Sequence, residues 1–200
     1  VSADITSDLF LQAALRYEDY SDFGEKLVWK LAGRYEFTDN FALRGSVGTG
    51  FRAPTPGQQG TTNVSTRLPD GFPVATGLFP AGGIVAQALG AEALKPETST
   101  NYAFGFTTDI GDLTLTVDAY QIEIEDRVYA TSTQDVSTNP TAGAAYDNYQ
   151  ALVTAGVSGA ESIGGVFFFQ NAFDTVTRGI DVVATYSFDW SAGTTKLIGS

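Results

Sequence analysis

The chain has 200 residues, with 11 Lys and Arg against 23 Asp and Glu, and it contains no Cys, His or Met. A hydrophobic fraction of 43% is too high for an acidic disordered chain, and a net charge of −12 argues against nucleic-acid binding, which needs clustered Lys and Arg. The missing Cys and His exclude disulfides, thiolate zinc sites and Ser–His–Asp catalysis. We therefore expect no enzyme activity, no catalytic or metal-binding residues and no cofactor.

The two ends of the sequence and its apolar runs bear on membrane insertion and export. The longest purely apolar run, residues 166–169, is far shorter than a transmembrane helix. The chain starts at Val1 without the basic and apolar regions of a signal peptide. We therefore expect it to be an internal piece of a larger protein.

Apolar and polar side chains alternate with a period of two along most of the chain. In residues 26–38 the apolar side chains fall on one face: Leu27, Trp29, Leu31, Tyr35 and Phe37. The charged ones fall on the other: Lys26, Lys30, Arg34 and Glu36. Successive side chains of a strand point to opposite faces, so the pattern predicts a strand with one apolar and one charged face. Similar alternation predicts strands at 9–18, 41–51, 101–110 and 180–190, with Arg44 and Asp181 on polar faces.

The predicted strand at 113–124 changes its parity part-way along. Its apolar residues are odd-numbered up to Val117 and even-numbered from Tyr120. A bulge near residues 118–119 would return them to one face, because one extra residue reverses the register. The alternative is a straight strand whose second half stands clear of any apolar solvent.

The connections between the predicted strands alternate between short and long. Residues 39–40, 111–112 and 191–193 are tight turns, whereas residues 52–96 and 129–165 are long loops rich in Gly, Pro, Thr, Ser and Asn. A short helix is expected within 84–94. One rim of the sheet is therefore predicted to carry only tight turns, and the other rim to carry the long loops. We expect the whole chain to form a single domain.

Tight turns at one rim, long loops at the other and aromatic residues beside the turns are typical of a transmembrane β-barrel. Hydrocarbon offers no hydrogen-bond partners, so a closed antiparallel sheet is one of only two structures that can span it. The apolar faces would then meet lipid, and the charged faces would line the lumen. Six charged residues are predicted to face the lumen: Lys26, Lys30, Arg34, Glu36, Arg44 and Asp181. A soluble, secreted β-sandwich that serves in binding or adhesion is the alternative interpretation.

Two sequence motifs give a more specific indication of the protein family. The sequence GTGFRAPT at 48–55 ends a predicted strand, and LKPETS at 94–99 opens the next one after a long loop. Together they resemble TonB-dependent outer-membrane receptors. The stretches 15–24 and 113–128, and Asn171 followed by TRGID at 177–181, are similar to the same family and occur in the expected order.

This resemblance implies a barrel of about 22 strands plugged by an N-terminal domain, in the outer membrane of a Gram-negative bacterium. Residues 1–200 would form about seven of those strands, without the plug, the TonB box or the C-terminal strands. Such receptors import scarce ligands such as ferric siderophores, cobalamin, haem or glycans. The implied partners are outer-membrane lipid, the plug, a small-molecule or metal-chelate ligand, and the TonB–ExbB–ExbD complex acting through the N-terminal part. A passive porin-type channel is the alternative within the same membrane.

The long loops would contribute to ligand capture, and the lumen-facing charges would contact the plug. The loop residues with suitable chemistry are cationic or aromatic: Arg52, Arg67, Phe72, Phe79, Tyr146 and Tyr149. Arginine suits an anionic ligand, and exposed aromatic rings supply large contact areas. Each has a structural alternative, because Arg52 would also suit a salt bridge at the corner of the wall and the aromatic residues would also suit packing of loop on loop.

Overall fold

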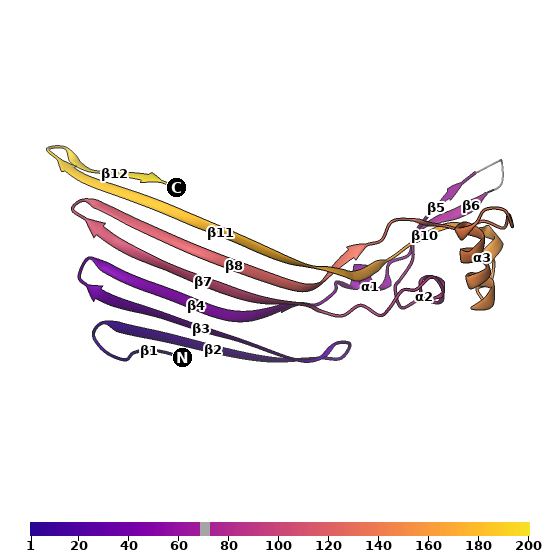
Figure 1. The fold of residues 1–200 in the computed structure, drawn as a ribbon, viewed down its shortest axis with the longest axis horizontal. Coiled ribbons are helices and arrows are strands. Elements are labelled where there is room, and N and C mark those ends of the chain that lie inside the picture. Colours follow the sequence, from indigo (N-terminus) through magenta and orange to yellow (C-terminus); the bar gives the residue numbers. More distant parts are fainter. Residues whose placement is uncertain (69–72) are drawn as a thin grey trace. The chain divides into compact units, whose positions relative to one another are not determined.

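The computed structural model describes residues 1–68 and 73–200 of the chain. Eight strands form one sheet in the order β1-β2-β3-β4-β7-β8-β11-β12, so that sheet order follows chain order (Figure 1). These strands are β1 (Ser2–Asp4), β2 (Leu9–Tyr20), β3 (Gly24–Thr38), β4 (Phe41–Arg52), β7 (Glu97–Ile110), β8 (Leu113–Ala130), β11 (Phe169–Trp190) and β12 (Gly193–Gly199). The predicted antiparallel all-β fold is confirmed, and the short β1 adds an eighth strand to the seven expected. No helix in the described ranges has the length and hydropathy needed to cross a membrane.

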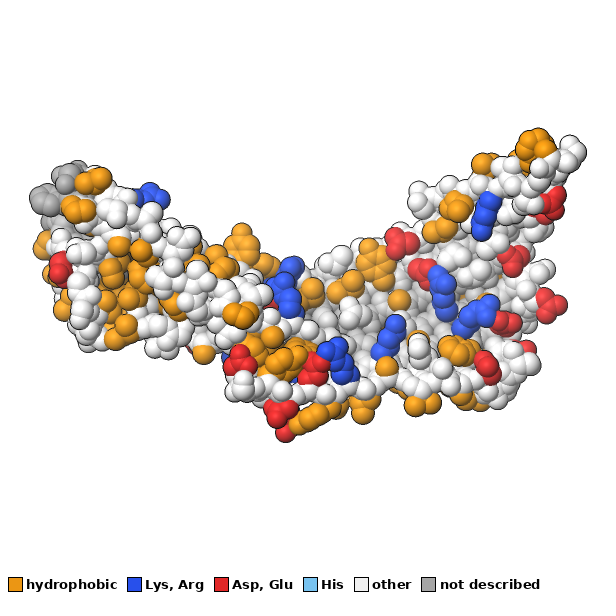
Figure 2. Space-filling model, turned by 180° about the vertical axis from the view of Figure 1, so that it is seen from behind, with side chains coloured by type: hydrophobic (Ala, Val, Ile, Leu, Met, Phe, Trp, Pro, Cys, Tyr) orange, Lys and Arg blue, Asp and Glu red, His pale blue; other side chains and the backbone are white. Residues whose placement is uncertain are grey.

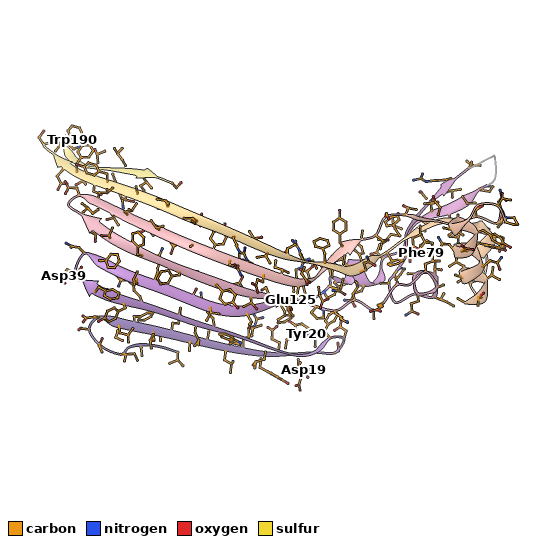
Figure 3. The ribbon with its side chains drawn as sticks, viewed as in Figure 1. Asp19, Tyr20, Asp39, Phe79, Glu125 and Trp190 are labelled. Carbon is orange, nitrogen blue, oxygen red and sulfur yellow. The ribbon has the colours of Figure 1, made fainter. Side chains whose placement is uncertain are left out.

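The tight turns gather at one end of this sheet. Residues 39–40 join β3 to β4, residues 111–112 join β7 to β8, and residues 191–192 join β11 to β12. Gly111 has a φ of +61°, which a two-residue hairpin turn requires and a glycine adopts without strain. Figure 3 places Asp39 and Trp190 at this end and Tyr20 at the opposite one. The predicted division into a trimmed rim and an elaborated rim is therefore present.

The bulge expected near residues 118–119 is absent from the β7–β8 ladder. The register runs without a shift from Thr98 opposite Glu125 to Ile110 opposite Leu113. The parity change therefore moves side chains to the other face, and Tyr120 lies on the face opposite to that of Val117. The straight-strand alternative is the correct one, since continuous backbone pairing is kept at the expense of a uniform apolar face.

The apolar face of the eight-stranded sheet is exposed rather than buried. Leu15 is 72% exposed, Leu31 52% and Ile180 71%, and all three lie on the predicted apolar face. A soluble sandwich would pack such side chains into a dry interior. Their exposure is what a lipid-facing surface requires.

Aromatic rings line the turn end of this apolar face. Tyr35 and Phe37 have ring centroids 4.6 Å apart, Phe37 and Phe41 6.0 Å, and Phe41 and Phe106 5.9 Å. From Phe37 to Leu27, at about 3.3 Å per residue and a tilt of about 40°, the face covers about 25 Å of depth, the height of the apolar band of an outer-membrane barrel. The predicted aromatic girdle is thus a connected row of rings at one edge of that band.

Residues 52–97 and 126–173 form a second compact unit. Its four-stranded sheet has the order β5-β6-β10-β9, from β5 (Asn63–Arg67), β6 (Val74–Leu78), β9 (Gln134–Asp135) and β10 (Ile163–Phe167). Its helices are α1 (Pro56–Gly60), α2 (Ile84–Ala88) and α3 (Ala144–Thr154), with a 3-10 turn at Ala160–Ser162. The core of this unit is buried: Ala81, Ala86, Ala91, Val136, Leu152, Ala160, Val166 and Phe168.

The prediction of long irregular loops at 52–96 and 129–165 is wrong for most of this second unit. The helix expected within 84–94 exists but is shorter, because Gly90 adopts a φ of +92° after the helix ends at Ala88. Helix α3 and the four strands were not predicted. Strand β10 pairs with the distant strands β6 and β9, so the local pattern lacks the signal for this part of the sheet.

Replacing Leu31 with Arg in the full-length protein is expected to destabilise it by about 2–4 kcal/mol, since it places a charge near mid-depth on the face that is predicted to meet lipid. Ala32→Arg is the matched control, because it adds the same side chain to the charged face. The fraction of folded protein in outer membranes, measured by heat-modifiable gel mobility, should fall for Leu31→Arg and change much less for Ala32→Arg. Equal losses would contradict the assignment of the two faces.

Candidate functional site

The charged side chains of β3 and β4 share one face of the sheet. Arg34 lies opposite Arg44 in the register, and Lys26 lies opposite Glu18 of β2. Lys30 and Glu36 have the same parity as Arg34 and therefore join this face. Asp181 of β11 lies between Ile180 and Val182, both exposed on the apolar side, and so has the polar parity too. The six residues predicted to face the lumen thus share a polar surface, and their contact with a plug stays a prediction.

Ion pairs join charges within this polar surface. Arg16 pairs with Glu18 and Arg34 with Glu36, each along a single strand. Arg44 pairs with Asp118 of β8, with Nε of the arginine donating to Oδ1 of the aspartate at 2.8 Å. Figure 2 looks onto the hollowed face of the sheet, where Lys and Arg gather among Asp and Glu.

A glycine makes room for the bridge between Arg44 and Asp118. Strand β7 lies between β4 and β8, so the two side chains meet across it. Gly105 of β7 is paired with Asp118, and a Cβ at this position would collide with the Asp118 carboxylate. The bare backbone at Gly105 therefore allows the bridge to cross the strand. Gly105 was not among the predicted site residues, although a lone glycine inside an alternating strand indicates close approach of a neighbouring group.

The two sequence motifs that carry the family resemblance, FRAP and LKPE, contact each other at one buried carboxylate. Glu97 of LKPE is only 5% exposed, and its Oε1 accepts a hydrogen bond from Arg52 Nη2 of FRAP at 2.5 Å. The same oxygen accepts the backbone N–H of Val128 at 2.8 Å. Three separate segments are thereby tied together at the ends of β4, β7 and β8. This places Arg52 in a structural bridge, while its predicted ligand contact stays untested.

Asn171 forms a second tie in the same unit. Its Oδ1 accepts the backbone N–H of Lys95 at 2.9 Å, and its Nδ2 donates to the carbonyl oxygens of Lys95 at 3.0 Å and of Asp126 at 2.6 Å. One amide therefore binds the segment before β7 and a position within β8. Asp126 has a φ of +56°, a left-handed conformation that is uncommon outside glycine. The hydrogen bond to its carbonyl helps hold that conformation.

The loop residues proposed for ligand capture divide by their surroundings. Phe79 and Tyr149 pack against the buried core of the second unit, and Figure 3 labels Phe79 there. Tyr146 lies beside Tyr149 on α3, with ring centroids 6.1 Å apart, and Arg67 is exposed at the end of β5. Phe72 lies outside the described residues. Arg52 and Arg67 are thus exposed, whereas Phe79, Tyr146 and Tyr149 are half-buried, and contact of any of them with a ligand stays a prediction.

A hollow of about 500 Å³ lies beside Arg67 in the second unit. Thr76, Thr133 and Asp135 line it together with Gly164. These residues were not predicted as a site, because they come from three segments that only the β6–β10 and β9–β10 pairings bring together. The hydroxyl, carboxylate and guanidinium groups suit a polar ligand. In the described ranges no three acidic side chains converge as a metal site.

Comparison with known proteins decides the family. The sequence matches the TonB dependent receptor-like β-barrel family over residues 1–200. The chain belongs to this family. Members are transport receptors of the Gram-negative outer membrane rather than enzymes, and the resemblance carried by FRAP and LKPE is thus confirmed.

Individual relatives agree with this assignment. The vitamin B12 transporter BtuB of Photobacterium profundum is 28% identical over 134 residues, which cover 67% of this chain and 18% of the transporter. The crystal structure of the siderophore receptor PirA from Pseudomonas aeruginosa is 16% identical and superposes with a TM-score of 0.61 over 98% of this chain and 32% of the receptor. A ferric enterobactin receptor mutant (PfeA) of the same species, in complex with enterobactin, is 15% identical with a TM-score of 0.62, over 94% of this chain and 23% of PfeA. The chain therefore spans less than a third of the length of each.

Glu97→Ala is expected to destabilise the second unit by about 1–3 kcal/mol, because it leaves the Val128 N–H without its acceptor and Arg52 without its partner. Glu92→Ala is the control, since Glu92 is exposed in the same unit. Hydrogen exchange of the Val128 amide should accelerate in the first variant only. Unchanged protection of that amide would show that the tie contributes little.

Gly105→Val is expected to cost about 1–3 kcal/mol by forcing a side chain into the Asp118 carboxylate. Adding Asp118→Ala removes the carboxylate that the new side chain meets but leaves the contact with the Val117 carbonyl oxygen, so the double variant should recover only part of the loss. Urea unfolding in lipid vesicles measures both changes. If Asp118→Ala gives no recovery in the Gly105→Val background, the glycine is not making room for the bridge.

Proposed function

We propose that this chain is part of the barrel wall and outer loops of a receptor that imports a scarce ligand across the outer membrane with energy from the TonB–ExbB–ExbD complex. The observation that carries the proposal is a sheet with one exposed apolar face and one ion-paired face, whose long connections fold into a unit with its own core. A wall of this kind suits lipid on one side and an aqueous lumen on the other. The folded loops suit ligand capture at the outer rim.

The eight-stranded sheet needs further strands to function. Both β1 and β12 present a strand edge, and an unpaired edge is not viable in hydrocarbon. We therefore place residues 1–200 in a partial barrel, which strands elsewhere in the full-length protein close and a plug domain fills. Lys26, Lys30, Arg34, Glu36, Arg44 and Asp181 would line the lumen and contact that plug.

The ligand class follows from chemistry and from relatives. A vitamin B12 transporter, a siderophore receptor and a ferric enterobactin receptor all resemble this chain. We propose a ferric siderophore, cobalamin, haem or a glycan as the cargo. Arg67 and Tyr146 are the best candidates for direct contact, and Arg52, Phe79 and Tyr149 would hold the loops that present them.

Transport is tested in a strain that lacks the chromosomal gene and carries the full-length receptor on a plasmid. Growth limited for iron, cobalamin or carbon is measured with ferric siderophores, haem, cobalamin or maltodextrins as the supply. We expect one ligand class to restore growth, and we expect deletion of tonB to abolish that growth. Uptake that persists without TonB would contradict active import and favour a passive channel.

A further inference from the structure

The four-stranded sheet of the second unit has one face on its core and one face away from it. Val166 of β10 and Val136, which follows β9, belong to the buried core together with residues of α2 and α3. Successive residues of a strand point to opposite faces, so the paired residues Gly165 and Asp135 lie on the other face. Asp135 lines the hollow beside Arg67, which therefore opens on the face away from the core.

A polar row crosses this face from one edge strand to the other. The register pairs Ser65 of β5 with Thr76 of β6. Thr76 is in turn paired with Gly165 of β10, and Gly165 is paired with Asp135 of β9. Directly paired residues share a face, so two hydroxyl groups and a carboxylate lie in one line across the sheet. Arg67 has the parity of Ser65 and adds a guanidinium at the same edge.

Thr76 is a buried polar residue in the middle of this row. It is only 8% exposed, and its carbonyl oxygen accepts a hydrogen bond from Ser65 Oγ at 3.3 Å. Its own hydroxyl makes no hydrogen bond to any residue in the ranges 1–68 and 73–200. A buried hydroxyl without a partner costs free energy, so such groups are normally paired. Because Thr76 lines the hollow, a ligand there would supply the missing partner.

A glycine allows two threonines to approach each other across β10. A Cβ at Gly165 would lie 2.8 Å from the Thr133 methyl group and 2.9 Å from the Thr76 methyl group, closer than carbon atoms pack. Both threonines line the hollow. The bare backbone at Gly165 therefore brings a second hydroxyl-bearing residue beside Thr76.

Two opposite charges line the same hollow without neutralising each other. Arg67 and Asp135 are both exposed, and in the described part of the chain neither forms an ion pair. They belong to the two edge strands of the sheet, three strand spacings or about 14 Å apart along the backbone. A ligand that binds both must carry an anionic group at one end and hydrogen-bond donors at the other, several residues' width of sheet away.

We propose that this hollow binds an acidic disaccharide, with a uronic acid at the Arg67 end. The uronate carboxylate accepts paired hydrogen bonds from the guanidinium, the geometry in which arginine recognises carboxylates best. Hydroxyl groups of the second sugar donate to Asp135, whose carboxylate only accepts. Thr76 and Thr133 bond the sugar hydroxyls between these ends. The inference rests on the proposed function, because it narrows the cargo to an acidic glycan.

The same groups disfavour the other cargo classes at this position. A ferric chelate with several negative charges would be repelled by Asp135, and a porphyrin needs an apolar lining where this hollow presents Thr76 and Thr133. A free α-amino acid is too short to reach from Arg67 to Asp135. The volume of about 500 Å³ lies in the range of small-molecule sites and suits two sugar rings.

The test uses the full-length receptor, purified in detergent and titrated with digalacturonate and with neutral digalactose by isothermal titration calorimetry. The wild type is expected to bind digalacturonate about tenfold more tightly, because the hydrogen bonds to Arg67 are charge-assisted. Arg67→Gln should abolish this preference. Lys95→Gln is the matched control and should keep it, since Lys95 is an exposed cation of the same unit that lines a different hollow.

Thr76→Val separates ligand binding from a structural role. Valine has nearly the shape of threonine, and the Thr76 hydroxyl has no partner in the described ranges, so the Tm of the receptor should not fall. The affinity for digalacturonate should fall about fivefold, because one hydrogen bond to the sugar is lost. A lower Tm with unchanged affinity would show that the hydroxyl serves the fold instead and would count against the site.

Three further results would overturn the proposal. They are equal affinity of the wild type for the two disaccharides, no binding of either one, and an equal loss in Arg67→Gln and Lys95→Gln. The growth assay keeps this inference separate from the proposed function. If the receptor supports TonB-dependent growth on another ligand class and does not bind digalacturonate, the acidic-glycan site is wrong while active import stands.

Discussion

Hydrocarbon cannot accept or donate a hydrogen bond, and the arrangement of the sheet follows from that constraint. Each peptide group within the membrane must find its partner on a neighbouring strand. The β7–β8 ladder accordingly runs through thirteen consecutive pairs without interruption, even where the apolar residues of β8 change faces. Uninterrupted pairing takes precedence over side-chain pattern, because an unpaired backbone group in lipid costs several kcal/mol. The side chains then adapt: Tyr120 turns inward and covers Gly179 of β11.

The same residue types serve opposite purposes in the two compact units. Phe168 in the second unit is 2% exposed and belongs to a dry core, whereas Phe104 on the sheet is 61% exposed. The difference agrees with the family, whose members sit in the outer membrane, where lipid rather than a protein core covers the apolar face of a barrel wall. On the polar surface of the sheet, charged side chains pair with each other, as Arg44 does with Asp118. Such pairs lie partly exposed, so they contribute modestly to stability and chiefly fix where each charge sits.

Local periodicity was enough to predict most strands of the eight-stranded sheet, the tight turns and the two faces, because all three depend on neighbours one or two residues apart. It did not indicate the short β1 or the part of β11 before residue 180. It failed for the second unit, where the parallel pairing of β6 with β10 joins residues such as Ala75 and Ile163. It failed for α3 as well, whose N-cap is Gly143 at a φ of +60° with no capping side chain. The candidate site shows the same limit, because local patterns do not predict contacts between residues far apart in the sequence. The charged face was predicted, whereas the bridge between Arg44 and Asp118, 74 residues apart, was not.

The residues that identify the family have structural roles. The motifs that assign a sequence to the family therefore do not indicate which ligand it binds. Arg52 and Glu97 are hydrogen-bonded to each other and belong to the two most specific sequence motifs, FRAP and LKPE. Glu97 also accepts a hydrogen bond from the Val128 amide. Asn171 ties Lys95 to Asp126. Such ties keep strand ends in place whatever the cargo, so receptors for different ligands can share them. These ties therefore identify the family and do not by themselves indicate which ligand is bound, so contact of loop residues such as Arg67 and Tyr146 with a ligand stays a prediction.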